Sequence, residues 1–324
     1  MLKLALLVLV SLAFAACGSS APRGGVRFAI AIHGGAGVID KGGPEAERDS
    51  YTLSLERALR HGRDRLAAGD SALDVVESVV RMLEDDPNFN AGKGAVFTED
   101  GRHELDASIM DGKNLACGAV AAVRTVKNPI SLARAVMERT KHVMLASDGA
   151  EQFATIAGVE RVDPSYFDTD KRKKALEKFL ENRKREQERS RGTVGCVALD
   201  TSGNLAAATS TGGMTGKRFG RIGDSPVIGA GTYADNKTCA VSCTGTGEEF
   251  IRHVVAYQVS ALMRYAGMSV DKAARTVIFE RLQPDDGGLI AVSRTGEISM
   301  PYSSSGMFRG AADSTGRFGV AIWE

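Results

Sequence analysis

Residues 192–200 read Gly192-Thr193-Val194-Gly195-Cys196-Val197-Ala198-Leu199-Asp200. The run follows a stretch of charge that is too polar to bury, and it opens an apolar segment typical of a buried strand. A small hydroxyl residue therefore stands at the start of a strand, directly after a glycine. Cutting the 192–193 bond would leave Thr193 with a free α-amine beside its own hydroxyl. That single residue would then supply both a nucleophile and a base.

The composition is that of an ordinary globular protein. The chain has 324 residues, of which 43% are hydrophobic and 25% charged, enough for one large domain or two small ones. Its formal net charge of +1 provides no global field for nucleic acid or anionic membranes. Residues 181–191 are rich in charge, but glutamates interrupt the basic residues and no aromatic residue lies among them. This segment is interpreted as a solvated linker, and we expect no nucleic-acid partner.

The N-terminus predicts export. Residues 4–14 are apolar but too few to span a bilayer, and small residues precede Cys17. Residues 1–16 are therefore predicted to be a lipoprotein-type signal, with Cys17 as the lipidated first residue of a periplasmic, membrane-anchored protein. Cleavage after 13–15 by an ordinary signal peptidase, giving a soluble secreted form, is the alternative.

The remaining cysteines do not suggest a metal or redox centre. Cys239 and Cys243 lie four residues apart in an apparent strand, about 13 Å at the rise of a β-strand, so they cannot pair with each other. The spacing of cysteines and histidines does not match a zinc site. The sequence favours small buried residues and leaves the disulfide state open for Cys117, Cys196, Cys239 and Cys243.

The pattern of elements predicts an α/β fold. Before residue 192 we expect a strand at 26–32 leading into a glycine loop, helices at 45–68 and after Ser71, a hairpin of 104–110 with 115–123, helical segments over 130–158, and a charged linker over about 165–192. After it we expect strands at 193–200, 205–211, 227–231, 238–242, 288–293 and 297–300, with helices at 247–265 and 269–282. Because strands and helices are grouped, stacked antiparallel sheets with helices outside are favoured over a Rossmann-type fold. An α/β/β/α sandwich fits this order.

Two glycine-rich segments do not match nucleotide-binding loops. Gly35-Ala36-Gly37 lacks the third glycine, because Asp40 stands there. The segment 212–218 has the wrong glycine spacing for a phosphate loop, and Arg218 stands where a metal-binding hydroxyl is needed.

Five motifs in order resemble one known family. They are His33-Gly34-Gly35-Ala36-Gly37, Gly192-Thr193-Val194-Gly195, Thr209-Ser210-Thr211-Gly212-Gly213-Met214, Gly220-Arg221-Ile222-Gly223-Asp224-Ser225-Pro226 and Ser242-Cys243-Thr244-Gly245-Thr246-Gly247-Glu248. Together they resemble the plant-type (class 3) asparaginases and isoaspartyl peptidases, which are N-terminal-nucleophile (Ntn) threonine hydrolases. The resemblance implies a four-layer αββα sandwich that cuts itself between Gly192 and Thr193. The products would be an α subunit, residues 17–192, and a β subunit, residues 193–324, forming one globular domain and paired as (αβ)2.

The resemblance also implies residue roles. Thr193 is the nucleophile, Thr211 orients it, and Thr244 and Gly245 form the oxyanion hole. Arg221 binds the α-carboxylate of an L-aspartyl substrate, Asp224 binds its α-ammonium, and Gly247 shapes the pocket. Asn90 braces the nucleophile region. No cofactor is implied for catalysis, but a structural sodium ion is implied, held by the backbone carbonyls of Leu83, Glu84, Asp86, Phe89, Ala91 and Lys93.

These roles imply a hydrolase that releases L-aspartate from L-asparagine, from β-aspartyl (isoaspartyl) dipeptides, or from both. A glycosylasparaginase, acting on sugar-linked asparagine, shares this machinery, but Gly192 stands where that branch usually has Asp. The other alternative is a catalytically silent lipoprotein that uses the same fold as a binding module. The sequence does not decide between asparagine and dipeptide.

Overall fold

The computed structural model describes residues 26–37, 42–182 and 192–323. The predicted signal 1–16, the predicted lipidation site Cys17 and the end of the charged linker, 183–191, lie outside the described residues. Within the described residues, no helix combines the length and the apolar character needed to cross a membrane.

The larger of two sheets has eight strands in the order β12-β11-β1-β5-β6-β2-β3-β4. Every neighbouring pair is antiparallel except β3 and β4, which are parallel. The predicted hairpin around residues 111–112 is confirmed as β2 and β3. In chain order the strands are β1 (Ala29–Gly37), β2 (Leu105–Asp111), β3 (Cys117–Val123), β4 (Met144–Ala146), β5 (Val194–Leu199), β6 (Leu205–Thr211), β11 (Gly306–Asp313) and β12 (Phe318–Ala321).

The smaller sheet has four strands in the order β10-β9-β8-β7 and packs against the first. Its strands are β7 (Thr232–Ala234), β8 (Cys239–Gly245), β9 (Gly287–Ser293) and β10 (Ile298–Ser299). Strand β8 contacts β5 and β6, and β9 contacts β1. Small side chains such as Ala31, Ala207 and Ala240 fill much of this interface, so the two sheets approach closely. An α/β fold with two mainly antiparallel sheets is therefore confirmed.

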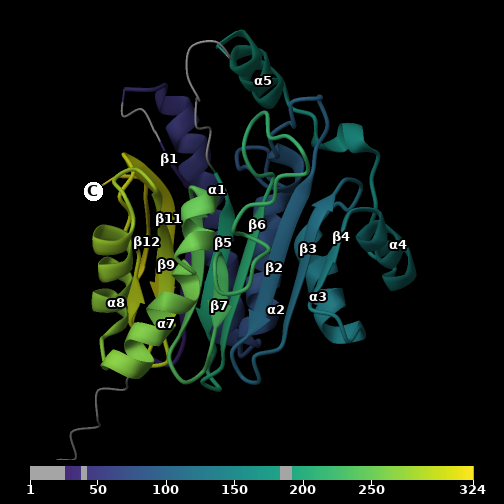
Figure 1. Ribbon diagram of the computed structural model, residues 1–324. Helices are drawn as coiled ribbons and strands as arrows, with labels where there is room; N and C mark the ends of the chain where they lie inside the picture. The colour runs from purple at the N-terminus through teal and green to yellow at the C-terminus, as the bar shows by residue number, and fades with distance from the viewer. Residues whose placement is uncertain (1–25, 38–41, 183–191, 324) are drawn as a thin grey trace, which may run out of the picture.

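Helices lie on the outer faces of both sheets (Figure 1). The larger sheet contacts α1 (Glu45–Ala68), α2 (Ala72–Glu84) and α3 (Pro129–Arg139), and the smaller contacts α7 (Val255–Ala266) and α8 (Val270–Thr276). Helix α2 begins as predicted, because the Ser71 side chain accepts a hydrogen bond from the Asp74 amide at 3.1 Å. Its buried apolar stripe, including Val75, Val79 and Leu83, faces the sheet.

The structure differs from the predicted strands at residues 33–37 and at residues 227–231. Strand β1 continues through the glycine motif to Gly37 instead of ending before it, with a register shift between His33 and Gly35. The predicted strand at 227–231 is absent, and β7 begins only at Thr232. Residues 227–231 turn instead, with the Val227 amide donating to the Asp224 carbonyl at 2.8 Å.

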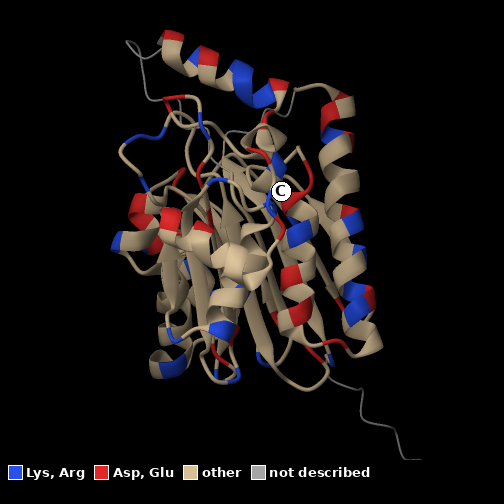
Figure 2. Cartoon of the chain, turned by 90° about the vertical axis from the view of Figure 1, so that its right-hand side faces the viewer, with Lys and Arg blue, Asp and Glu red and all other residues tan. Residues whose placement is uncertain are grey.

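Other elements were not predicted. Strands β11 and β12 complete the large sheet beside β1, and β4 interrupts the predicted helical region before α4 (Ser147–Ala157). The charged segment is not simply a linker, because it contains η2 (Pro164–Phe167) and α5 (Asp170–Asn182). Figure 2 shows acidic and basic residues interspersed along the outer helices, in keeping with the near-zero net charge. The short elements are η1 (Gly92–Gly94), α6 (Gly247–Arg252) and η3 (Val277–Arg281).

Candidate active site

The threonines picked out by the sequence lie at or next to the ends of strands from both sheets. Thr193 directly precedes β5, Thr211 is the last residue of β6, and Thr244 lies near the end of β8. All three are buried. The Thr193 hydroxyl donates a hydrogen bond to the Thr211 hydroxyl at 3.1 Å. The structure therefore brings the predicted nucleophile and its predicted orienting residue together.

Two donors converge on the carbonyl oxygen of Gly192. The Asn90 amide nitrogen lies 2.8 Å from it, and the Thr211 hydroxyl lies 3.1 Å from it. Asn90 is itself held, because its Nδ2 also donates to the Gly213 carbonyl at 2.7 Å and its Oδ1 accepts from the Val96 amide at 2.9 Å. The side chain predicted as a brace thus contacts the 192–193 bond directly.

The glycine motif of β1 lies against the same bond. Gly35 has φ of +115°, and a Cβ there would stand 2.9 Å from the Cα of Gly192. A side chain at this position would be strained and would also collide with the chain. The next amide, that of Ala36, donates to the Thr244 hydroxyl at 3.2 Å, so the motif links the 192–193 bond to the predicted oxyanion hole.

His33 anchors the far side of Thr193, a role that sequence analysis missed. Its Nδ1 lies 3.0 Å from the Thr193 carbonyl, which can only accept, so Nδ1 carries the proton. Its Nε2 then accepts from the Ser242 hydroxyl at 2.8 Å. Complete burial lowers the pKa of His33 to about 3, so the ring is neutral. Its two hydrogen bonds hold the Thr193 backbone in position against β8. Its partners are distant in sequence, and only the fold reveals them.

The predicted oxyanion glycine is required by packing. A Cβ at Gly245 would lie 2.0 Å from the Asp286 carbonyl oxygen. Any other residue would have to displace that backbone, which forms part of the turn into β9. Gly245 therefore lets the end of β8 lie directly against the backbone of Asp286 and Gly287.

Arg221 and Asp224 lie together, as the resemblance implies. A Cβ at Gly247 would stand 2.8 Å from Arg221 Nη2 and 3.0 Å from Asp224 Oδ1, so only glycine leaves both in place. Asp224 is buried, and its Oδ2 has no hydrogen-bond partner among the described residues. Burial raises the pKa of its carboxyl to about 7.

Glu248, the last residue of the motif at 242–248, contacts Arg221, which the sequence did not predict. Its two carboxylate oxygens accept from Arg221, Oε1 from Nε and Oε2 from Nη2, each at 2.9 Å. This bidentate pair fixes the plane of the guanidinium and leaves Nη1 outside the pair.

Lys217 places a second cation near the site, from the segment 212–218. Its Nζ is buried, donates to the Glu104 carbonyl at 2.8 Å and lies 3.9 Å from a carboxylate oxygen of Asp106. A Cβ at Gly213 would lie 3.2 Å from Lys217 Nζ and 3.5 Å from Arg221 Nη1. Both cations therefore border Gly213. The carbonyls of Gly213 and Gly192 accept hydrogen bonds from the same Asn90 amide nitrogen.

The predicted sodium loop follows α2. Leu83 and Glu84 end the helix, so their carbonyls lack the usual helical donors. A Cβ at Gly92 would lie 2.3 Å from the Glu84 carbonyl oxygen, and the loop is therefore tightly wound. The Lys93 ammonium lies 5.3 Å from the centroid of the Tyr166 ring, over which it stacks. Across residues 26–37, 42–182 and 192–323, no group of three or more His, Cys, Asp or Glu side chains could hold a metal ion.

The Glu84 side chain, by contrast, points into the core. Its Oε1 accepts from the Ser210 hydroxyl at 2.6 Å and from the Ile130 amide at 3.0 Å. Burial raises the pKa of this carboxyl to about 8, so it is largely protonated at neutral pH. Ser210 directly precedes Thr211, which ties the end of β6 to α2.

Known proteins match this chain over nearly its whole described length. The family model described as asparaginase matches residues 26–322. An isoaspartyl peptidase of Escherichia coli is 48% identical over 308 residues, covering 90% of this chain and 95% of the relative. A probable isoaspartyl peptidase/L-asparaginase 2 of Arabidopsis thaliana is 47% identical, covering 92% and 99%, and the human isoaspartyl peptidase/L-asparaginase is 43% identical, covering 90% and 95%. The resemblance carried by the five motifs is thereby confirmed, and the chain belongs to the asparaginase family.

Proposed function

We propose that this protein is an isoaspartyl peptidase and L-asparaginase that cuts itself before Thr193 and then releases L-aspartate from β-aspartyl compounds. The names of its relatives support the activity. The observation that carries the mechanism is the chain of contacts from the Thr193 hydroxyl through Thr211 to the Gly192 carbonyl oxygen. The Thr193 hydroxyl can attack, the Thr211 hydroxyl can accept its proton, and the Gly192 carbonyl oxygen is held by hydrogen bonds, all at the 192–193 peptide bond.

Self-cleavage follows from that geometry. The Thr193 oxygen attacks the Gly192 carbonyl carbon, and Asn90 and Thr211 donate to the carbonyl oxygen as it becomes negative. The hydroxyl proton passes toward Thr211, the carbon–nitrogen bond breaks, and the nitrogen gains a proton to become the α-amine. Water then hydrolyses the ester, giving a carboxylate on Gly192 and restoring the Thr193 hydroxyl.

The freed amine makes Thr193 its own base. An α-amine has an ordinary pKa of about 7.7–8.0, so it is mostly protonated at pH 7. The buried cation of Lys217 and the partly buried cation of Arg221 border Gly213 and favour the neutral amine. The amine accepts the hydroxyl proton during attack on substrate, Thr244 and Gly245 donate to the oxyanion, and the amine protonates the leaving nitrogen. Water then releases aspartate.

The charged groups suit an L-aspartyl substrate. Arg221 pairs with the α-carboxylate through its Nη1 side, since Glu248 occupies Nε and Nη2. Asp224 pairs with the α-ammonium, and its unpartnered buried oxygen is the group that such a cation would satisfy. The reacting β-carbonyl then extends toward Thr193.

The finer architecture is part of this proposal. The order of contacts, helices on one sheet, sheet on sheet and helices on the other sheet, supports the four-layer αββα sandwich of the Ntn hydrolases. We further propose α and β subunits of residues 17–192 and 193–324, associated as (αβ)2. The export signal and lipid anchor at Cys17 stay predictions from the sequence.

A sodium ion is proposed as a structural element only. The backbone carbonyls of the loop after α2 are the hard oxygen donors that such an ion prefers, and those of Leu83 and Glu84 have lost their helical partners. The Lys93 ammonium lies over the Tyr166 ring, so the backbone carbonyl of Lys93 remains available as a ligand for the ion. The ion would hold the loop that carries Asn90.

Intact-mass analysis of purified protein tests the proposal directly. Wild type is expected as two fragments whose second begins Thr-Val-Gly-Cys, and Thr193→Ala as one chain. The wild type should also release L-aspartate from L-asparagine or β-aspartyl-leucine. A wild type that stays uncut and inactive would favour the binding-module alternative, whereas activity only on sugar-linked asparagine would favour a glycosylasparaginase.

A further inference from the structure

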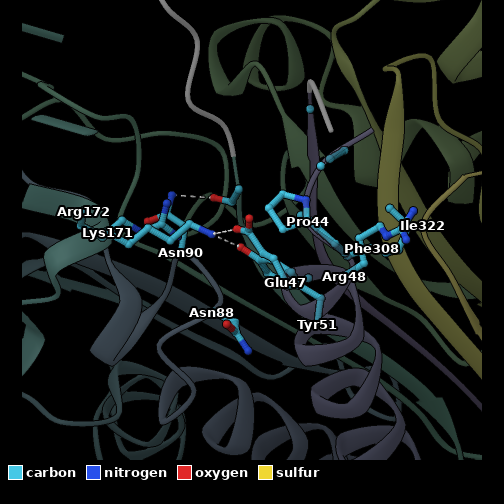
Figure 3. Close-up of a pocket in the computed structure, with 16 residues that line it drawn as sticks. Pro44, Glu47, Arg48, Tyr51, Asn88, Asn90, Lys171, Arg172, Phe308 and Ile322 are labelled. Carbon is cyan, nitrogen blue, oxygen red and sulfur yellow. Dashed lines mark hydrogen bonds and ion pairs between the residues drawn. The ribbon is translucent and has the colours of Figure 1, made fainter. Parts of the chain in front are cut away.

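A cavity of about 250 Å³ opens beside Gly192. Its walls come from the glycine motif of β1, from α1, from the start of α5, and from Phe308 and Ile322 near the C-terminus (Figure 3). Neither Arg221 nor Asp224 lines it, so it is distinct from the place proposed for the aspartyl group. It is slightly smaller than the roughly 300–1,000 Å³ of sites for drug-sized ligands, which suits a single amino acid.

The position of the cavity follows the path of a leaving group. In the uncut chain the Thr193 nitrogen is bonded to the Gly192 carbonyl carbon. After cleavage that nitrogen is the amine that must protonate the departing nitrogen of the substrate, so the departing group lies on the side that Gly192 occupies. The cavity is lined by Gly192, Gly35 and Asn90, and it therefore opens on that side.

We propose that this cavity is the subsite for the leaving amino acid of a β-aspartyl dipeptide. The inference rests on the proposed function and deepens it by naming the residues that would hold the leaving amino acid and so set the preference for dipeptide over asparagine. The leaving residue carries one α-carboxylate and one side chain. The cavity offers a cationic wall for the first and an apolar wall for the second.

The cationic wall has an excess of positive charge. Arg48, Lys171 and Arg172 line the cavity, whereas Glu47 is its one carboxylate among the described residues. Lys171 forms an ion pair with Glu47 and donates to the Tyr51 hydroxyl at 2.8 Å (Figure 3). Its side chain is about half exposed. Arg172 Nε is held by the Gly94 carbonyl at 2.6 Å. Glu47 and Tyr51 already hold the Lys171 ammonium in place. The α-carboxylate of the leaving residue would therefore compete with Glu47 for the Lys171 ammonium.

The apolar wall is rigid. Tyr51 stacks on Phe308 with ring centroids 4.3 Å apart, and Ile322 and Pro44 complete the lining. Tyr51 is nearly buried and also meets Phe89 edge to face, so its ring is fixed in place. A leucine-sized side chain can pack on this surface, whereas the ammonia released from asparagine leaves it empty.

The experiment compares kcat/KM for three substrates of the mature enzyme: β-aspartyl-leucine, its C-terminal amide and L-asparagine. Lys171→Gln should lower the ratio of dipeptide to asparagine kcat/KM about tenfold, because a charge-assisted hydrogen bond is lost. Glu47→Gln should raise the same ratio severalfold, because the competitor for Lys171 is removed. The amide-capped dipeptide should respond to neither change.

Lys174→Gln is the matched control, since Lys174 is exposed on the same helix and does not line the cavity. It should leave the ratio as in wild type. Equal losses on dipeptide and asparagine, or a shift in the same direction for both variants, would overturn the subsite, and so would an equal loss on the amide. If Lys171→Gln fails to fold, Glu47→Gln decides alone. A wild type that cuts neither asparagine nor dipeptide would contradict the proposed function instead.

Discussion

The amide nitrogen of Asn90 lies 2.8 Å from the carbonyl oxygen of Gly192, although 102 positions separate the two residues. The contact joins the loop after α2 to the bond before β5. Because the same amide is fixed by Gly213 and Val96, it is oriented before any reaction begins. Preorganised donors of this kind stabilise charge that develops in a transition state.

Asn90→Ala should therefore slow self-cleavage about a hundred- to a thousandfold, the usual cost of losing one oxyanion donor. Asn90→Asp should be at least as slow, because a carboxylate repels the developing negative charge. A time course of intact masses after refolding measures the rate. Asn114→Ala, in an exposed turn, serves as the control. Cleavage of Asn90→Ala at the wild-type rate would remove Asn90 from the mechanism.

Asp224 should make substrate binding depend on pH. Only the ionised carboxylate attracts the α-ammonium of the substrate, and burial raises the pKa of this group to about 7 in the free site. kcat/KM should then rise as the pH increases through about 7 and level off above it, with this change carried by KM. Asp224→Asn should raise KM and lose that part of the profile. A profile with the same lower limb in Asp224→Asn would contradict the assignment.

Glu84 should make the fold less stable as the pH rises. Folding raises its pKa from 4.5 to about 8, so between these values the folded state holds a proton that the unfolded state has released. The free energy of unfolding then falls with increasing pH across this window, by at most about 1.4 kcal/mol per pH unit for one proton.

This effect can be measured as Tm between pH 5 and 8 in a Thr193→Ala background, which keeps the covalent state constant. Glu84→Gln should flatten the slope, whereas Glu177→Gln, on the exposed face of α5, should not. An unchanged slope in Glu84→Gln would show that other groups cause the dependence.

Glu248→Gln should raise KM for L-asparagine by about threefold to tenfold with a smaller effect on kcat. The bidentate contact holds Arg221 in one plane, and a neutral amide holds it less firmly. The effect is modest because the Glu248 side chain is 43% exposed and solvent screens the pair. Glu249→Gln, the neighbouring carboxylate, which pairs with the exposed Arg252 and not with Arg221, is the matched control. A fall confined to kcat would rule out this positioning role.

The sequence was a good guide at several positions where neighbouring residues decide the local structure. The Ser71 cap of α2 and the hairpin loop 112–116 between β2 and β3 both depend on neighbours within a few residues. The predicted helix at 45–68 matches α1, Glu45–Ala68, at both ends. The grouping of Thr193, Thr211, Asn90, Arg221 and Asp224 rested on the family resemblance, and the structure brings them together in the pairs described above.

What the sequence could not provide depends on distant partners. The β-strand at 306–313 gave no clear signal, since its pairing partner is β1 at the opposite end of the chain. The role of His33 needs Ser242, and that of Lys217 needs Glu104 and Asp106. One failure was local: the predicted strand at 227–231 is absent because the Val227 amide donates to the Asp224 carbonyl, three residues earlier, and closes a turn there.

The order of strands in the large sheet determines what a cut before Thr193 would leave behind. Strand β1 precedes the cut but is hydrogen-bonded on both sides to strands that follow it, β11 and β5. The pair β5–β6, in turn, is enclosed between β1 and β2. Strands of the two pieces would alternate within one sheet, so each piece would lack neighbouring strands if it folded alone. We therefore expect the sheet to form from one polypeptide before the cut. After the cut, the two pieces would separate only if the hydrogen bonds of β1 with β11 and β5, and of β6 with β2, were broken.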